Sequence, residues 1–466
     1  MNDMPLKTIA KSLRTGALSA TGLAKEVIAR RESSAERLDS YAFWAPEIAL
    51  TMARSADEAF AQGHELGRLQ GIPVSIKDLF AVRDMPIYAG SPRRLPAKFE
   101  IEGPVVSKLR EQGAVFTGKT HTSEVGFGVC GDNIHWGTPR NPWDADELRP
   151  AGGSSSGAAI SILEGSALVG MGSDTGGSAR EPANMTGIVG LKVTHGRWSG
   201  AGLIPPGPSL HGPGLLTRSA ADAAFAFAAI DDGPDADRFE RACDDTGIES
   251  IRIGVLDDYF WSECEPGIAQ AVRSALEELA HAGATLKSLA LPEAQELGKI
   301  SPDWDWGVSA VELSEFMQAE LPEWLNTLHP GARSQLQSQE QLSAIEYLRR
   351  CRLLKEFSRL ADRTLDDVDV VVCPTSPMSP PLLKELADPE RYRQISRLAA
   401  RNMCVANLLD LCALTMPVGL NPDGLPIGLQ LLSRHNADES LLTAACAFER
   451  VLGTGAQRLG IPPLCQ

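Results

Sequence analysis

Two glycine- and serine-rich stretches decide how this sequence is interpreted: AGGSSSG at residues 151–157 and GSDTGGSAR at residues 172–180. The first runs into a predicted helix at 156–165, and the second follows an apolar run at 167–171 that is typical of a buried strand. A single loop of this kind is usually a flexible connection. Two of them that bracket one helix and one strand return to the same edge of a parallel sheet, where ligands bind. The pair therefore predicts a binding site.

The second stretch also supplies the groups that an anion site needs. Its glycine-rich turn presents a series of backbone N–H groups, and such turns bind anions. These are the N–H groups of Thr175, Gly176, Gly177 and Ser178. The oxyanion that forms during acyl transfer is one such anion. The sequence thus favours acyl transfer at this loop.

Outward from these stretches, helical and strand patterns alternate along the chain. Residues 1–66 have the spacing of helices, 71–77 and 252–256 read as strands, and 295–345 are polar and helical. This alternation predicts an α/β fold with a mixed, mostly parallel central sheet covered by helices on both faces. Without a linker or repeat, residues 1–466 are predicted to form a single large domain.

Net charge and composition limit the classes of partner. The 466 residues carry 44 Lys and Arg against 60 Asp and Glu, a formal charge of −16, with a pI near 5.1. A surface this negative repels phosphate backbones and anionic lipid headgroups. We therefore expect neither nucleic acid nor a membrane surface as a partner.

Cysteine and histidine usage bears on the compartment and on metal binding. The nine Cys are scattered singly without a CxxC pair, and the eight His include no HExxH motif. Dispersed cysteines in odd number indicate a reducing compartment rather than a disulfide framework. No apolar run approaches the roughly 18 residues of a spanning helix, and residues 1–13 lack the pattern of a secretory signal. We expect a cytoplasmic protein with no dedicated metal site.

Residues 113–120, GAVFTGKT, match the P-loop pattern GxxxxGK[ST] letter for letter. A P-loop places its four variable positions in a loop whose amides wrap phosphate. Here they are Ala-Val-Phe-Thr, which favour a buried strand, and the preceding residues 105–112 favour a helix rather than the required strand. We predict a strand and no nucleotide site.

Residues 153–157 satisfy G-x-S-x-G, the nucleophile elbow of α/β-hydrolases. An elbow needs a strand directly before its serine, and Pro150 argues against a central strand there. No His stands in a recognisable setting for a triad. This alternative is the weaker one.

With these motifs in view, the sequence resembles the amidase signature family of serine hydrolases. The family core reads approximately GGSSSG, then G-[ST]-D-x-G-G-S-[IV]-R-x-P-A, then GLKPT-x-GR. The corresponding stretches are GGSSSG at 152–157, GSDTGGSAREPA at 172–183 and GLKVTHGR at 190–197. Further similar stretches are GIPVSIKD at 71–78, GAVFTGKT at 113–120, PTSP at 374–377 and DGLPIGLQ at 423–430. The resemblance spans nearly the whole chain, with its core at residues 71–218.

The resemblance implies a Ser–Ser–Lys triad: Ser178 as nucleophile, Ser154 as a bridging serine in a cis peptide, and Lys77 as base. The physical chemistry is consistent, because a serine hydroxyl needs a neighbouring base and Ser–Lys variants of the triad exist. A free lysine has a pKa of about 10.4, so Lys77 must be desolvated to act as a base near neutral pH.

The resemblance also implies supporting roles. The oxyanion hole and substrate-binding residues would be Thr175, Gly176, Gly177, Gly126, Gly128 and Cys130. Ser155, Asp174 and Arg180 would support the oxyanion loop. For Cys130, a buried inert thiol is the alternative. No cofactor is implied.

The expected function is hydrolysis of a small carboxylic amide. Three departures from the family pattern leave the substrate open. Val193 replaces a usual proline, and residues 144–150 are slightly longer than the usual link into the GGSSSG loop. Residues 203–213 lack the S-x-D-x-x-G-P wording of the tRNA-dependent amidotransferase branch. The alternatives are the glutamine-hydrolysing subunit of an amidotransferase, a hydrolase of carbamates, esters or anilides, a silent binding protein and a nucleotide binder.

Two further expectations concern the substrate and the assembly. Residues 295–345 are expected to form a variable cap over the pocket, in which Trp304, Trp306 and Trp324 would favour an aromatic or apolar acyl group, although ordinary packing is the alternative. A symmetric homodimer is the default expectation for the oligomeric state.

Overall fold

The apolar segments predicted as strands assemble into one central sheet. The computed structural model describes residues 4–205, 207–231, 235–256, 258–300, 307–339 and 341–466. In order across the sheet, the eleven strands among these residues are β1 (Tyr41–Trp44), β3 (Val115–Thr120), β2 (Pro73–Lys77), β4 (Val169–Asp174), β6 (Gly212–Thr217), β5 (Val189–Lys192), β10 (Cys412–Leu420), β11 (Pro426–Ser433), β9 (Val370–Pro374), β7 (Arg252–Leu256) and β8 (Thr285–Leu289).

The sheet is mixed, as predicted, but parallel pairing is not predominant. Strand β2 pairs in parallel with β3 and β4, and β7 pairs in parallel with β8 and β9. The other six pairings between the described strands are antiparallel. The expectation of a mostly parallel sheet is therefore wrong. Strands β6, β5, β10 and β11 pair antiparallel and lie between two groups of parallel strands, β3–β2–β4 and β9–β7–β8.

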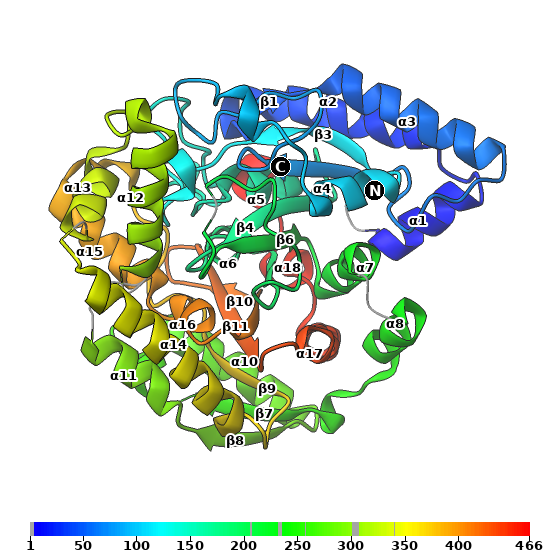
Figure 1. The fold of residues 1–466 in the computed structure, drawn as a ribbon. Helices are drawn as coiled ribbons and strands as arrows, with labels where there is room; N and C mark the ends of the chain where they lie inside the picture. The colour runs from blue at the N-terminus through cyan, green and yellow to red at the C-terminus, as the bar shows by residue number, and fades with distance from the viewer. Residues whose placement is uncertain (1–3, 206, 232–234, 257, 301–306, 340) are drawn as a thin grey trace.

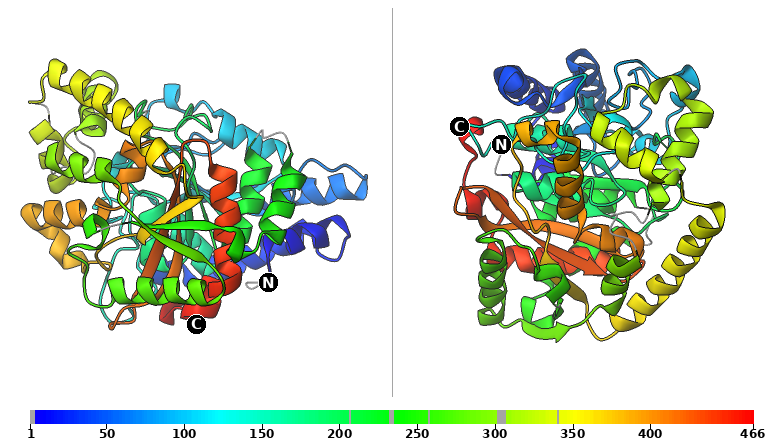
Figure 2. Two further views of the ribbon diagram at one scale, coloured as in Figure 1. Left: turned by 90° about the horizontal axis from the view of Figure 1, so that it is seen from below. Right: turned by 90° about the vertical axis from the view of Figure 1, so that its left-hand side faces the viewer.

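The helices flank this sheet and lie around the outside of the molecule (Figures 1 and 2). They are α1 (Leu6–Arg14), α2 (Ala20–Leu38), α3 (Pro46–Ala61), α4 (Pro104–Glu111), α5 (Ser156–Glu164), α6 (Arg180–Thr186), α7 (Ala220–Ile230), α8 (Ala236–Asp245), α9 (Asp258–Trp261), α10 (Ile268–His281), α11 (Pro292–Ile300), α12 (Val308–Glu320), α13 (Pro330–Gln339), α14 (Ala344–Thr364), α15 (Pro389–Ala400), α16 (Cys404–Leu408), α17 (Asp438–Leu452) and α18 (Gly455–Leu459). Within the described ranges, none of them has the length and apolar character needed to cross a membrane.

The two faces of the sheet pack against different helices, as strand β6 illustrates. Leu215 belongs to the apolar cluster that includes side chains of α7, α10 and α17, whereas its neighbour Leu216 packs with side chains of α5 and α6. Successive side chains of a strand point to opposite faces, so one strand contributes to both layers. The predicted single domain with helices on both faces is confirmed.

Local predictions from the sequence hold along most of the N-terminal half. Helices α1, α2 and α3 occupy the region predicted as helical, interrupted by the short strand β1 that the periodicity did not indicate. The P-loop-like residues form the buried strand β3, and Lys119 donates to the Asp78 carboxylate at 2.7 Å. Its ammonium group is thus committed to an internal ion pair rather than to a phosphate.

The segment predicted as a cap contains α11, α12, α13 and the start of α14, which lie along one side of the molecule (Figure 1, yellow-green). Trp304 and Trp306 lie outside the described residues. Trp324 is partly buried, and its indole N–H donates to Ser91 Oγ at 3.0 Å. The contact observed for Trp324 is therefore structural.

Candidate active site

Lys77 ends strand β2 in the middle of the first parallel run. The apolar residues Val74 and Ile76 hold this strand between β3 and β4, and Lys77 itself has no exposed surface. Its side-chain nitrogen, Nζ, donates to Ser154 Oγ at 2.7 Å and to Ser173 Oγ at 2.9 Å. The lysine is therefore held by two hydroxyl groups.

Burial determines the protonation of this lysine. Desolvation lowers the pKa of Lys77 well below its ordinary value of 10.5, and the nearby Asp174 carboxylate opposes the shift. No carboxylate lies within ion-pair distance of its nitrogen in the part of the chain that the structure describes. A lysine without a paired anion is readily neutral, which is the form that accepts a proton.

Ser154 lies in a tight loop that precedes helix α5. The Gly153–Ser154 peptide bond is cis, the geometry that the family resemblance implies for this serine. The N–H of Gly153 donates to Val129 O at 2.7 Å, and Ser154 O accepts from the N–H of Ser123 at 3.3 Å. A Cβ on Gly153 would lie 2.4 Å from the backbone nitrogen of Gly131, so a glycine is needed here.

Ser178 follows strand β4 and precedes helix α6. Its side chain is 5% exposed, and its carbonyl accepts from the N–H of Ser155 at 3.1 Å, which joins the two predicted loops directly. Gly177 has a φ of +122°, a conformation that favours glycine. The structure thus brings the two glycine- and serine-rich stretches together with the end of β2.

The backbone amides of the second loop are not all available to a ligand. The N–H of Gly177 donates to Asp174 Oδ1 at 3.0 Å and is thereby engaged within the loop. Among the described residues, none accepts a hydrogen bond from the N–H groups of Thr175, Gly176 and Ser178. Three of the four predicted oxyanion donors therefore remain candidates, and Gly177 serves the turn instead.

A fully buried ion pair between Arg180 and Asp174 holds the loop of residues 174–180 in place. Arg180 donates to both oxygens of Asp174, at 2.9 and 3.0 Å, and also to the side chains of Asn407 and Gln430. Burial by itself would raise the pKa of Asp174, but the charge and hydrogen bonds of Arg180 outweigh it and hold that pKa below its usual range. The carboxylate is ionised and fixes the loop through Gly177.

Replacing Arg180 with methionine should strongly destabilise the protein. It leaves the buried Asp174 carboxylate without its cation, and breaking such a pair typically costs about 3–5 kcal/mol. Denaturant unfolding followed by far-UV circular dichroism measures the loss. Lys299→Met is the control, because Lys299 is 66% exposed and pairs with Glu296 at the surface. An equally small effect of both substitutions would contradict this role of Arg180.

The predicted substrate-binding residues Gly126, Gly128 and Cys130 lie in a segment that contacts the Ser154 loop through Val129, but they have different neighbours. A Cβ on Gly126 would lie 3.7 Å from Ser154 Oγ, and one on Gly128 would meet the Tyr392 hydroxyl at 2.9 Å. Cys130 is fully buried in an apolar cluster with Met378 and Tyr392, and burial raises the pKa of its thiol well above the usual range. The alternative of a buried inert thiol is therefore favoured over a pocket-lining role.

Two residues beside the predicted triad were not identified from the sequence. Ser173, on strand β4, accepts a hydrogen bond from Lys77 at its Oγ, and its N–H donates to the Oγ of Ser155 at 3.3 Å. The parallel register that sets Ile76 opposite Met171 brings Ser173 to this position, and sequence spacing does not reveal that register. The second residue is His211, which lies in the segment 203–213 that departs from the family pattern.

The structure places no group of three or more potential metal-ligating His, Cys, Asp or Glu side chains together, within the residues that it describes. The polar residues that the contacts above join to Ser154 are Lys77, Ser155, Ser173 and Ser178, together with backbone amides. This set suits proton transfer and nucleophilic attack by a hydroxyl group.

Comparison with known sequences places these features in context. A family model described as Amidase matches residues 23–442. The 2-amino-5-chloromuconic acid deaminase of Comamonas testosteroni is 41% identical over 458 residues, which cover 98% of this chain and 97% of that protein. A glutamyl-tRNA(Gln) amidotransferase subunit of Chloroflexus aggregans is 32% identical, over 94% of each chain.

Solved structures show the same architecture. A crystal structure described as an amidase superimposes with a TM-score of 0.84 at 28% identity, over 97% of this chain and 100% of that one. A chain from a study of the evolutionary origins of an s-triazine catabolic enzyme has a TM-score of 0.86 at 27% identity, over 97% of this chain and 99% of its own.

Proposed function

This chain belongs to the amidase signature family and is an amide C–N hydrolase, and from that premise we propose that it cleaves a small carboxylic amide through an acyl-enzyme on Ser178. Lys77 acts as the base and Ser154 relays the proton between Lys77 and Ser178. The observation that carries the proposal is the 2.7 Å contact between Lys77 Nζ and Ser154 Oγ, made by a buried lysine whose pKa is lowered.

In the first half of the reaction, Ser178 Oγ attacks the amide carbonyl carbon. Its proton passes to Ser154 Oγ while Ser154 passes its own proton to the neutral amine of Lys77. The N–H groups of Thr175, Gly176 and Ser178 stabilise the oxyanion. When the C–N bond breaks, the proton returns from Lys77 through Ser154 to the leaving nitrogen, and ammonia or an amine departs.

In the second half, water attacks the acyl ester on Ser178. The same relay takes a proton from that water and later returns one to Ser178 Oγ as the ester bond breaks. The products are the carboxylic acid and the free enzyme, so no cofactor enters the balance. Asp174 and Arg180 hold the oxyanion loop, and Ser155 and Ser173 position the relay.

The test is ammonia release by the purified chain alone over a panel of primary aliphatic and aromatic amides. We expect release from at least one amide without any added subunit. 2-Amino-5-chloromuconic acid joins the panel because a relative is named as its deaminase. Anilides, carbamates and esters form a second panel, followed by release of the amine or alcohol rather than ammonia, since the same attack by Ser178 could act on them. Silence across both panels would overturn the proposal of a hydrolase that acts alone.

The amidotransferase alternative rests on relatives named as glutamyl-tRNA(Gln) amidotransferase subunits, several at 30–32% identity. It predicts glutamine hydrolysis that depends on a further protein chain. Glutamine in the panel, with and without copurified proteins, separates the two functions. We further propose that the enzyme is a cytoplasmic homodimer, which size-exclusion chromatography with light scattering tests.

A further inference from the structure

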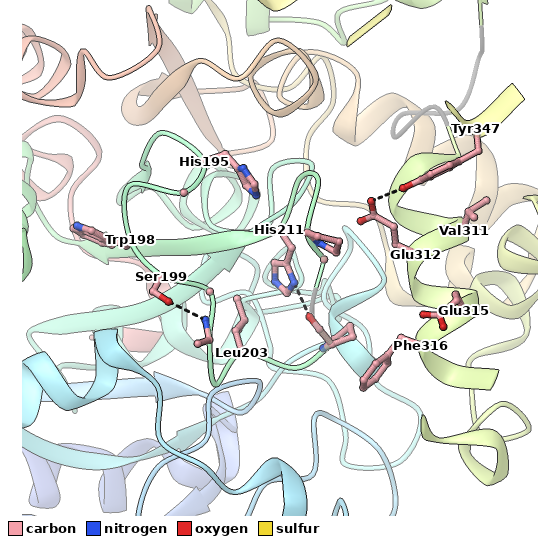
Figure 3. Close-up of a pocket in the computed structure, with 16 residues that line it drawn as sticks. His195, Trp198, Ser199, Leu203, His211, Val311, Glu312, Glu315, Phe316 and Tyr347 are labelled. Atoms are coloured by element: carbon pink, nitrogen blue, oxygen red, sulfur yellow. Dashed lines mark hydrogen bonds between the residues drawn. The ribbon is translucent and has the colours of Figure 1, made fainter. Parts of the chain in front are cut away.

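A cavity of about 720 Å³ lies between the segment after strand β5 and helix α12 (Figure 3). Its apolar lining includes Trp198, Leu203 and Phe316. The charged side chains at its wall are Glu312 and Glu315, and no lysine or arginine is among the described lining residues. Such a cavity has the size and apolar character of a small-molecule site.

His211 faces this cavity from the segment that leads into strand β6 (Figure 3). Its Nδ1 lies 3.0 Å from the carbonyl oxygen of Pro205. A carbonyl oxygen can only accept a hydrogen bond, so Nδ1 carries the proton and Nε2 keeps a lone pair. The orientation of the ring is therefore tied to one tautomer, whose free nitrogen is an acceptor.

His211 also lies beside the catalytic loop, because the next residue, Gly212, pairs with Asp174 between strands β6 and β4. Burial lowers the pKa of His211 to about 4, and Lys77 lowers it further when its side chain is protonated. Asp174 and His195 act on the same group in opposite directions, and Glu312 and Glu315 stand on the cavity wall. The ring is neutral at neutral pH, too weak a base to take a proton from water but able to accept a hydrogen bond.

We propose that His211 determines substrate specificity by accepting a hydrogen bond at Nε2 from an amino group on the acyl chain of the amide, whose apolar part fills this cavity. The inference rests on the proposed function, because it names the substrate class of the same site. The amino group is favoured over a carboxylate because the wall offers Glu312 and Glu315 and no cationic side chain among its described residues. A site built to bind a donor discriminates strongly against an analogue that lacks it.

Three primary amides of matched length test the proposal: 5-aminopentanamide, hexanamide and adipic acid monoamide. They end in an ammonium group, a methyl group and a carboxylate. We expect kcat/KM for 5-aminopentanamide to exceed that for hexanamide by at least about tenfold, with the monoamide the poorest. Equal values, or a preference for hexanamide or the monoamide, would overturn the inference.

Variants then assign the preference to His211. In His211→Leu the ratio between 5-aminopentanamide and hexanamide should fall to about one, and His211→Gln, which restores an acceptor, should recover part of it. His281→Leu, at an exposed position of α10, is the matched control and should keep the wild-type ratio. An unchanged ratio in His211→Leu would refute the assignment.

A measurement of binding affinity separates the test of His211 from the test of the proposed catalytic activity. Calorimetry on Ser178→Ala measures the affinity for the same three amides without turnover. If no amide is hydrolysed by the wild-type protein, the proposed function fails, while the affinity ratio still decides whether His211 selects an amino group. A ratio near one in that measurement overturns the inference regardless of activity.

Discussion

Substituting Ser178 with alanine should lower kcat/KM for every amide substrate by at least about 10⁴-fold, because no other group can form the acyl-enzyme. The substitution removes one oxygen atom from a buried site. The backbone contact from the N–H of Ser155 to the carbonyl oxygen of residue 178 does not use that atom. We therefore expect the variant to fold normally, and ammonia release together with thermal unfolding measures both properties.

Ser156→Ala is the matched control for this loss. Ser156 begins helix α5 two residues after Ser154, is buried, and its Oγ makes no hydrogen bond with a described residue. Its removal should change kcat/KM by no more than a few-fold. Comparable losses in both variants would mean that serine substitutions damage the loop generally, which would contradict a nucleophilic role for Ser178.

Lys77→Met should produce the second largest effect, a loss of at least about 10³-fold in kcat/KM. Without the base, Ser178 has no group that takes its proton through Ser154. The side chain keeps an unbranched apolar chain but loses the terminal nitrogen that contacts Ser154 and Ser173. Activity of the wild-type protein should rise with pH as Lys77 loses its proton, with an apparent pKa well below 10.5. The residual activity of Lys77→Met should lack this rise.

Stability provides an independent readout for the same variant. Because burial lowers the pKa of Lys77, the unfolded chain binds more protons than the folded protein between the lowered pKa and 10.5. The free energy of unfolding therefore rises with pH across this window, and Lys77 opposes folding below it. Lys77→Met should be no less stable than the wild type at neutral pH. A large loss of stability would indicate a structural lysine instead.

Lys192→Met separates a catalytic lysine from a merely buried one. Lys192 is also buried, its pKa is also lowered by burial, and it donates to the carbonyl oxygens of Val193 and Leu411. Its loss should reduce stability but leave the rise of activity with pH in place. Disappearance of that rise in Lys192→Met would contradict the assignment to Lys77.

The sequence predicted the features that lie within short, continuous stretches of the chain. The two loops, the buried strand that imitates a P-loop and the lysine at the end of β2 all follow from local composition and from short motifs. The family resemblance added the pairing of Lys77 with Ser154 and the cis geometry before Ser154, and both are present.

What the sequence did not reveal depends on packing between distant segments. The strand order, and with it the majority of antiparallel pairings, is set by how β6, β5 and β10 return beside β4. Ser173 reaches Lys77 through the register between β2 and β4, and residue spacing does not reveal that register. The contact from the N–H of Gly177 to the Asp174 carboxylate is local instead, between residues three apart in the same loop.

The central claim is that Ser178 carries the acyl group during turnover, and rapid acid quenching followed by mass spectrometry tests it most directly. With the best amide of the panel, we expect a mass increase equal to the acyl group minus one hydrogen, located by peptide mapping on Ser178 and absent from Ser178→Ala. An acyl group found on a different residue would contradict the account, as would full turnover by Ser178→Ala.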